Sequence, residues 1–113
     1  MMNDTKAVKT LSALAQPTRF GVFRLLMKYS QEGLSAGAIA EKISVPQNTL
    51  SSHLNILSNA GIITSERRGR ILNYTVEVEA VKIFMEYLVV DCCDGHPEIC
   101  FLASTNQNFV HKK

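Results

Sequence analysis

Residues 35–76 read SAGAIAEKISVPQNTLSSHLNILSNAGIITSERRGRILNYTV, and this stretch decides the fold. Ser35 is a residue type that caps helix N-termini, and the apolar spacing after it predicts a short helix over 36–43. The tight connection 44–46 leads into a second helix over 47–59, in which leucines at 50, 54 and 57 form one apolar stripe. Gly61 follows in the position that favours a positive φ. Two short helices joined by a tight turn predict a helix-turn-helix over 35–60.

The hydrophobic period changes from that of a helix to that of a strand after Gly61. Residues 62–67 and 70–76 predict two antiparallel strands, with Arg68-Gly69 as the turn between them. Leu72, Tyr74 and Val76 fall on one face of the second strand. A β-hairpin directly after this helix pair predicts a winged helix-turn-helix with arginines at the tip of the wing.

Three more helices flank this unit, over 5–15, 17–29 and 78–91. Pro17 separates the first two, because proline cannot continue a helix but fits the first turn of the next one. One face of the helix over 17–29 is predicted to carry Phe20, Phe23, Leu26 and Met27. We therefore predict a mainly α (α+β) fold in the order α-α-α-α-β-β-α, with one domain over 4–100 and a polar, flexible tail over 101–113.

Composition narrows the class of protein. The chain has 113 residues, and its net charge of +2 is too small to indicate a partner by itself. No apolar run is long enough for a transmembrane helix, and the first ten residues lack the apolar core of a signal peptide. We therefore expect a cytoplasmic protein that does not bind membranes.

The outward face of the helix over 47–59 predicts contact with double-stranded DNA. A major groove about 12 Å wide admits one helix, and uncharged amide and hydroxyl side chains can hydrogen-bond to base edges there. The first helical turn normally enters the groove deepest. The wing arginines would bind phosphates or a narrow minor groove. The predicted DNA-binding residues are Gln47, Asn48, Ser51, Ser52, His53, Asn55, Arg67, Arg68 and Arg70.

Other interpretations of these residues stay open. A polar helix face is often only a solvated surface, and an arginine-rich turn can simply aid solubility. His53 lies beside the leucine stripe, so a partly buried structural role is about as plausible as a phosphate contact. The first and last helices carry more apolar surface than a small core needs, which predicts a homodimer through both. The candidate interface residues are Val8, Leu11, Leu14, Phe84, Leu88 and Val89, some of which belong to the intrachain core.

All three cysteines fall in CCDGHPEIC, residues 92–100. Gly95 and Pro97 can fold Cys100 back toward Cys92 and Cys93 beyond the helix end. Three soft thiolates fit As(III) or Sb(III). Zinc or cadmium would prefer a fourth ligand, and a disulfide from Cys100 to one of the pair is a third possibility. The possible fourth ligands are His96, Asp91, Asp94 and Glu98.

Three segments carry a resemblance to a known family. ALAQPTRFGVFRLL (13–26), SVPQNTLSSHLNILSNAGIITSERRGRILNYTV (44–76) and the last helix resemble the ArsR/SmtB family of metal-responsive winged-helix repressors. The resemblance implies a dimer, made through the first and last helices, that blocks an operator until a toxic ion binds. As(III) or Sb(III) would then act as the inducer, and DNA binding itself would require no cofactor. Unlike the founding arsenic repressors, this chain has no cysteine over 36–52, and its last helix lacks the His/Asp pairs of the zinc sensors. CCDGHPEIC instead resembles the C-terminal CC…C site of an arsenite-responsive subgroup, which assigns Cys92, Cys93 and Cys100 as metal ligands.

The prediction is therefore an As(III)-responsive, dimeric transcriptional repressor rather than an enzyme. We find no nucleophile–base pair and no phosphate loop in the sequence, and His53, His96 and His111 are scattered. Within the same class, the alternatives are a zinc- or cadmium-sensing repressor and a thiol-redox repressor. Outside it, they are a small cytosolic metal-sequestering protein and a thiol-transfer or arsenate-reducing enzyme using Cys92.

Overall fold

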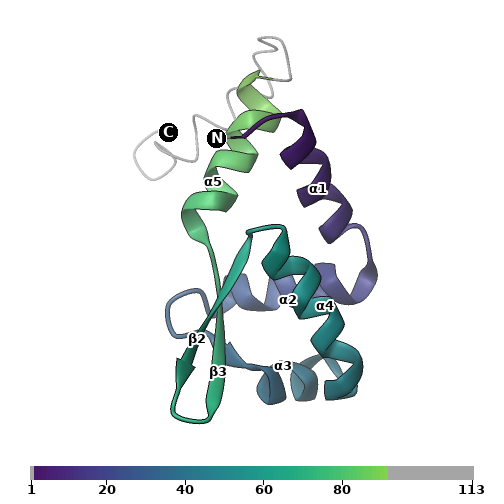
Figure 1. The fold of residues 1–113 in the computed structure, drawn as a ribbon, viewed down its shortest axis with the longest axis vertical. Coiled ribbons are helices and arrows are strands. Elements are labelled where there is room, and N and C mark those ends of the chain that lie inside the picture. Colours follow the sequence, from purple (N-terminus) through teal and green to yellow (C-terminus); the bar gives the residue numbers. More distant parts are fainter. Residues whose placement is uncertain (1, 92–113) are drawn as a thin grey trace, which may run out of the picture.

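A computed structural model describes residues 2–91 of the chain (Figure 1). Five α-helices are joined by three short strands, and the last helix continues into a π-helical segment. The elements are α1 (Asp4–Leu14), α2 (Pro17–Lys28), β1 (Leu34–Ser35), α3 (Ala36–Ile43), α4 (Gln47–Asn59), β2 (Ile63–Arg68), β3 (Ile71–Val76), α5 (Val78–Glu86) and η1 (Tyr87–Asp91). The predicted winged helix-turn-helix is confirmed, and α3 and α4 have the predicted bounds.

Local capping explains where the helices begin and end. The Ser35 side chain accepts a hydrogen bond from the Ala38 N–H, which starts α3 as the sequence predicts. Ser44 ends α3 in the left-handed region, with φ 60° and ψ 47°, and this turns the chain sharply toward α4. Gly61 has a φ of +85°, which confirms its predicted role after the end of α4.

The core lies where α2, α3, α4 and the sheet meet. The leucine stripe of α4, Leu50, Leu54 and Leu57, is almost completely buried, as predicted. The predicted apolar face of α2 is only partly buried, because Phe20 and Met27 are 48% and 45% exposed. The buried residues of α2 are Val22 and Leu26, which lie one turn apart and face α4 and α3.

The sheet has a strand that the sequence analysis missed. Its order is β1-β3-β2, and β1 pairs antiparallel with β3 through Leu34↔Tyr74 and Ser35↔Asn73. A strand of two residues shows no periodicity, so no pattern could predict it. The Asn73 side-chain amide adds a 2.8 Å hydrogen bond to the Glu32 carbonyl. The segment that enters α3 is therefore fixed to the wing, the β-hairpin of β2 and β3.

Two predicted boundaries need correction. The wing register pairs Arg68 with Ile71, so the turn is Gly69-Arg70 and not Arg68-Gly69. Gly69 has a φ of +67° at the first central position, which a type II′ turn reserves for glycine. The last helix is α-helical only over Val78–Glu86 and widens to a π-helix over Tyr87–Asp91. The widening begins at Tyr87, whose hydroxyl donates a hydrogen bond to the Asp4 carboxylate of α1.

The molecule has two distinct ends (Figure 1). The N-terminal half of α1 and the helix α5 lie side by side at one end. The tip of the wing, α3 and the start of α4 lie at the other end. No helix within residues 2–91 is both long enough and apolar enough to cross a membrane.

Candidate nucleic-acid interface

The polar face of α4 is solvent-exposed along the whole helix. Because the leucine stripe is buried, the opposite side chains point outward, and all five predicted uncharged polar residues are exposed. We call these five the reading face. They are Gln47, Asn48, Ser51, Ser52 and Asn55. The two serine hydroxyls donate to the carbonyls of Asn48 and Thr49 at 3.1 and 3.2 Å, so each hydroxyl oxygen keeps acceptor capacity toward a base or water.

The start of α4 is electrostatically suited to a negatively charged partner. Pro46 occupies the N-cap position and supplies no side-chain hydrogen bond, and the first turn has no acidic residue. The Asn48 side chain accepts from the Thr49 N–H at 2.9 Å. The positive end of the helix dipole therefore reaches the surface without a carboxylate to compensate it, which favours a nearby phosphate.

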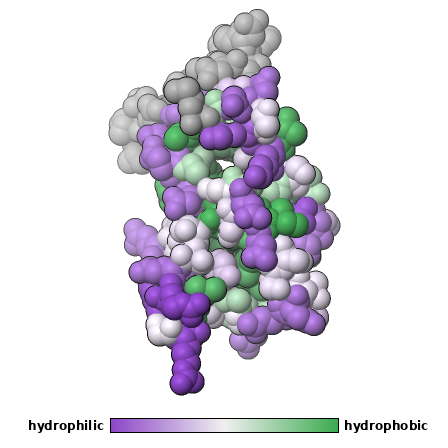
Figure 2. Space-filling model, viewed as in Figure 1, coloured by the Kyte–Doolittle hydropathy of each residue, from purple (hydrophilic) through white to green (hydrophobic). Residues whose placement is uncertain are grey.

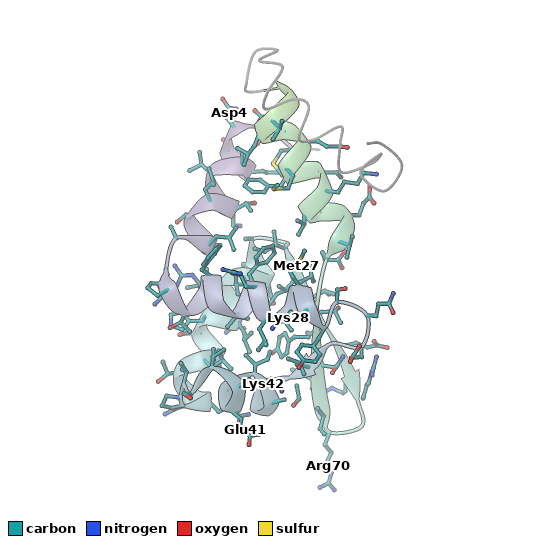
Figure 3. All side chains as sticks on the ribbon, turned by 180° about the vertical axis from the view of Figure 1, so that it is seen from behind. Asp4, Met27, Lys28, Glu41, Lys42 and Arg70 are labelled. Atoms are coloured by element: carbon teal, nitrogen blue, oxygen red, sulfur yellow. The ribbon has the colours of Figure 1, made fainter. Side chains whose placement is uncertain are left out.

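The wing carries its arginines at an exposed tip. Arg67, Arg68 and Arg70 are all exposed, and the Arg70 side chain extends away from the body of the molecule (Figure 3). The wing forms a strongly hydrophilic projection in the space-filling view (Figure 2). Arg68 lies 3.5 Å from the Glu66 carboxylate, but both side chains are mostly exposed, so this pair contributes about 0–1 kcal/mol. An anion can therefore replace Glu66 at little cost.

His53 lies between the reading face and the leucine stripe and is half-buried. Its Nδ1 is 3.2 Å from Nη1 of Arg19 on α2. The Arg19 Nε also donates to the Ala13 carbonyl at 2.6 Å, at the end of α1. His53 therefore has a structural partner inside the chain, and its predicted contact with DNA stays a prediction.

Sequence reasoning missed Arg19, although the sequence held a signal. Arg19 lies in the first turn of α2, where the helix dipole disfavours a cation. A cation in that position is favourable when its side chain reaches the negative end of another helix, and here it reaches the C-terminus of α1.

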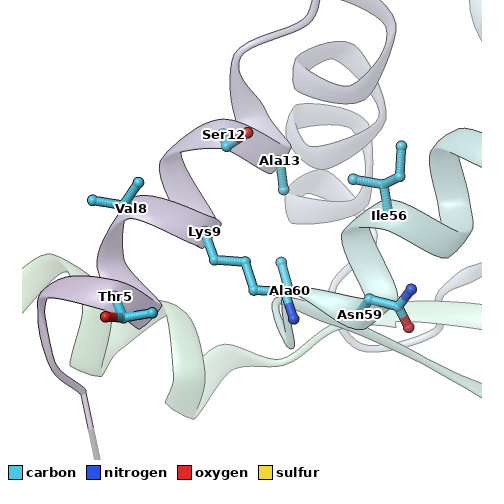
Figure 4. A pocket seen from close by; sticks show the side chains of 8 residues that line it. All are labelled: Thr5, Val8, Lys9, Ser12, Ala13, Ile56, Asn59 and Ala60. Carbon is cyan, nitrogen blue, oxygen red and sulfur yellow. The ribbon is translucent and has the colours of Figure 1, made fainter.

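An open groove of about 630 Å³ runs between α1 and α4 (Figure 4). Lys9 extends across it from α1 toward Ala60 at the end of α4. The groove is lined by Thr5, Val8, Lys9, Ser12, Ala13, Ile56, Asn59 and Ala60. Both apolar and polar side chains line the groove, which the sequence did not predict.

Only part of the predicted dimer surface is available. Val8 and Leu11 are 62% and 45% exposed on α1, whereas Phe84 is buried within the single chain and Leu14 packs against the core. Phe84 is therefore one of the candidates that belong to the intrachain core, as the prediction allowed for some of them. Leu88 and Val89 are half-buried in η1.

The predicted ligands Cys92, Cys93 and Cys100 lie outside the described residues. Between residues 2 and 91, no group of three or more His, Cys, Asp or Glu side chains is placed to hold a metal ion. The described part of the chain therefore offers no competing ligand set of that size.

A polar helix and a cationic hairpin, presented at one end of a winged helix-turn-helix, define a DNA-binding module. A family model described as a helix-turn-helix domain matches residues 14–66. An uncharacterized HTH-type transcriptional regulator of Methanocaldococcus jannaschii is 32% identical over 77 residues, which cover 68% of this chain and 84% of that protein. The HTH-type transcriptional repressor SmtB of Mycobacterium tuberculosis is 38% identical over 68 residues, 60% of this chain and 48% of that protein.

A solved structure shares the fold. It is the homodimeric winged helix-turn-helix DNA-binding domain of a possible ArsR-family regulator from Mycobacterium bovis, with a TM-score of 0.62 and 20% identity. The match covers 99% of this chain and 96% of that one. The chain belongs to the ArsR/SmtB family of winged-helix transcriptional regulators.

Proposed function

We propose that this chain is a homodimeric transcriptional repressor that binds operator DNA and releases it when As(III) or Sb(III) binds Cys92, Cys93 and Cys100. The observation that carries the DNA-binding part is the common end shared by the reading face and the arginine tip (Figure 1). Side chains that can read bases and side chains that can bind phosphates then meet one duplex together. The relatives are transcriptional regulators, which supports a role without catalysis.

A second copy of this chain would cover the exposed apolar face of α1. Burying the exposed parts of Val8 and Leu11 would contribute about 1–2 kcal/mol for each side chain. The solved homodimer from Mycobacterium bovis supports such an assembly. One short helix contacts only a few base pairs. A dimer would contact two half-sites about 34 Å apart and so double the length of DNA sequence that it reads.

The inducer part rests on donor chemistry and on position in the chain. Three thiolates match the preference of trivalent arsenic for three soft ligands. Cys92 directly follows Asp91, the last residue of η1, and η1 is tied to α1 through the hydrogen bond from Tyr87 to Asp4. A change at the thiols is therefore transmitted first to the two helices of the proposed dimer contact. A coupling of about 1–3 kcal/mol lowers operator affinity about 5–150-fold.

The test is an operator-binding titration under reducing conditions, with DNA from upstream of the protein's own gene. Arsenite and antimonite should each release the wild-type protein. Cys93→Ser should bind DNA as tightly as the wild type but keep it when arsenite is added. Release of the variant lacking all three thiols would disprove the sensor site.

The same titration separates the alternatives. A zinc or cadmium sensor would respond to those ions and weaken on His96→Ala, whereas the arsenite response should survive that change. A thiol-redox repressor would respond to an oxidant without any metalloid. A sequestering protein would not bind the promoter at all.

A further inference from the structure

Arg19 connects three helices. Its backbone N–H donates to the Gln16 side chain, which caps α2, at 2.8 Å. Its guanidinium donates to the Ala13 carbonyl at 2.6 Å and to the Ser12 carbonyl at 3.5 Å, both at the end of α1. The remaining nitrogen, Nη1, lies 3.2 Å from Nδ1 of His53 on α4. One planar group therefore joins the helix of the proposed dimer contact to the helix that carries the reading face.

The chemistry of the pair fixes the direction of its hydrogen bond. An arginine side chain only donates, so Nδ1 of His53 accepts. In the tautomer that accepts at Nδ1, the ring N–H is on Nε2, on the other side of the ring. Arg19 thus fixes one tautomer of His53 and leaves Nε2 as a donor.

This contact supplies what the leucine stripe cannot. Leu50, Leu54 and Leu57 bury one side of α4 and set which face points outward, and a hydrogen bond adds a directional constraint to this non-directional packing. The hydrogen bond from the charged Arg19 donor is directional. His53 directly follows Ser52 of the reading face, so its rotation and that of the face are the same.

We propose that Arg19 is a positioning residue for DNA binding, which holds the reading face at a fixed rotation relative to α1 through His53. This inference rests on the proposed function for its DNA readout. It adds a physical connection by which a displacement of α1 at the dimer contact reaches the bases.

The test is a double-mutant cycle on operator affinity, with unfolding by urea measured in parallel. His53→Gln keeps an acceptor and a donor and should bind within about threefold of the wild type. Arg19→Lys and His53→Leu should each weaken binding about tenfold, which is the loss of one hydrogen bond to a charged group. The double variant should be no weaker than the weaker single variant. Arg24→Lys is the matched control, because Arg24 lies on the same helix, over the Phe20 ring, and should leave affinity unchanged.

Three results would overturn the proposal. They are full affinity in His53→Leu, failure of His53→Gln to restore binding, and losses for Arg19 and His53 that multiply in the double variant. Amide hydrogen exchange on the free protein tests, without any DNA, whether the contact between Arg19 and His53 stabilises α4. Arg19→Lys and His53→Leu should speed exchange in the middle of α4 by the same factor, and His53→Gln should not. If the wild type binds no promoter DNA, the proposed function fails, while the exchange result still decides the role of Arg19.

Discussion

Gly33 offers a quantitative test of how the wing is attached. It is buried just before β1 and has a φ of +74°. A Cβ at this position would lie 2.6 Å from the Tyr74 carbonyl oxygen and 2.6 Å from Cγ2 of Thr75, and it would overlap the side-chain amide of Asn73. The backbone of β3 cannot move aside without breaking its pairing with β1 and β2. Gly33→Ala should therefore destabilise the protein strongly.

The magnitude follows from two separate contributions. A left-handed backbone costs a non-glycine residue about 1–2 kcal/mol. Forcing a methyl group into a packed site adds about 1–3 kcal/mol. Gly33→Ala should therefore cost about 2–5 kcal/mol of unfolding free energy. Gly61 has a similar φ of +85°, but a Cβ there would meet nothing within 4 Å. Gly61→Ala should show the backbone contribution alone, about 1–2 kcal/mol.

Urea unfolding of the wild type and both variants measures the difference directly. In a domain of this size, each kcal/mol also lowers Tm by about 4–8 °C. Gly33→Ala should be the less stable variant by about 1–3 kcal/mol, which is the steric contribution. Equal destabilisation of the two variants would refute the claim that Gly33 fills a close approach between the start of α3 and the wing.

Three further predictions concern function and stability. Arg70→Ala should weaken binding to every DNA sequence and reduce the slope of log affinity against log salt by about 1; an unchanged slope would remove Arg70 from the interface. Val8→Asp should shift the protein toward monomer in analytical ultracentrifugation, because a charge cannot be buried cheaply in an apolar contact, and a stable dimer would exclude this face. Ser44→Gly should raise the free energy of unfolding by about 0.5–1 kcal/mol, measured as a higher urea midpoint, since Ser44 adopts φ 60°; a lower midpoint would contradict the strain at this position.

The sequence predicted the elements that have strong local signals. The leucine stripe, the Ser35 cap and the glycine after α4 together defined α3 and α4 to the residue. Each of these signals depends on neighbours within one or two turns. The wing was also predicted, although its turn was displaced by one residue because Arg68-Gly69 and Gly69-Arg70 look alike without the register.

The remaining features depend on contacts between distant residues. The strand β1 exists because Leu34 meets Tyr74, and no spacing within the sequence reports that pairing. The bridge from Arg19 to His53 spans 34 positions, and only an unfavourable cation at a helix start hinted at it. The burial of Phe84 within the single chain likewise depends on tertiary contacts, which the spacing of apolar residues does not report. Local chemistry therefore predicted the reading face, and tertiary packing decided what holds that face in place.

The strand β1 also determines which motions are open to the molecule. The entry to α3 is hydrogen-bonded to β3, so the hairpin is tied directly to the start of the helix-turn-helix. Bending of the hairpin alone would break this pairing. In a dimer, an effector acting near α1 and η1 would therefore change the spacing and angle between the two DNA-binding modules. The two modules could then no longer contact both half-sites of the duplex at once.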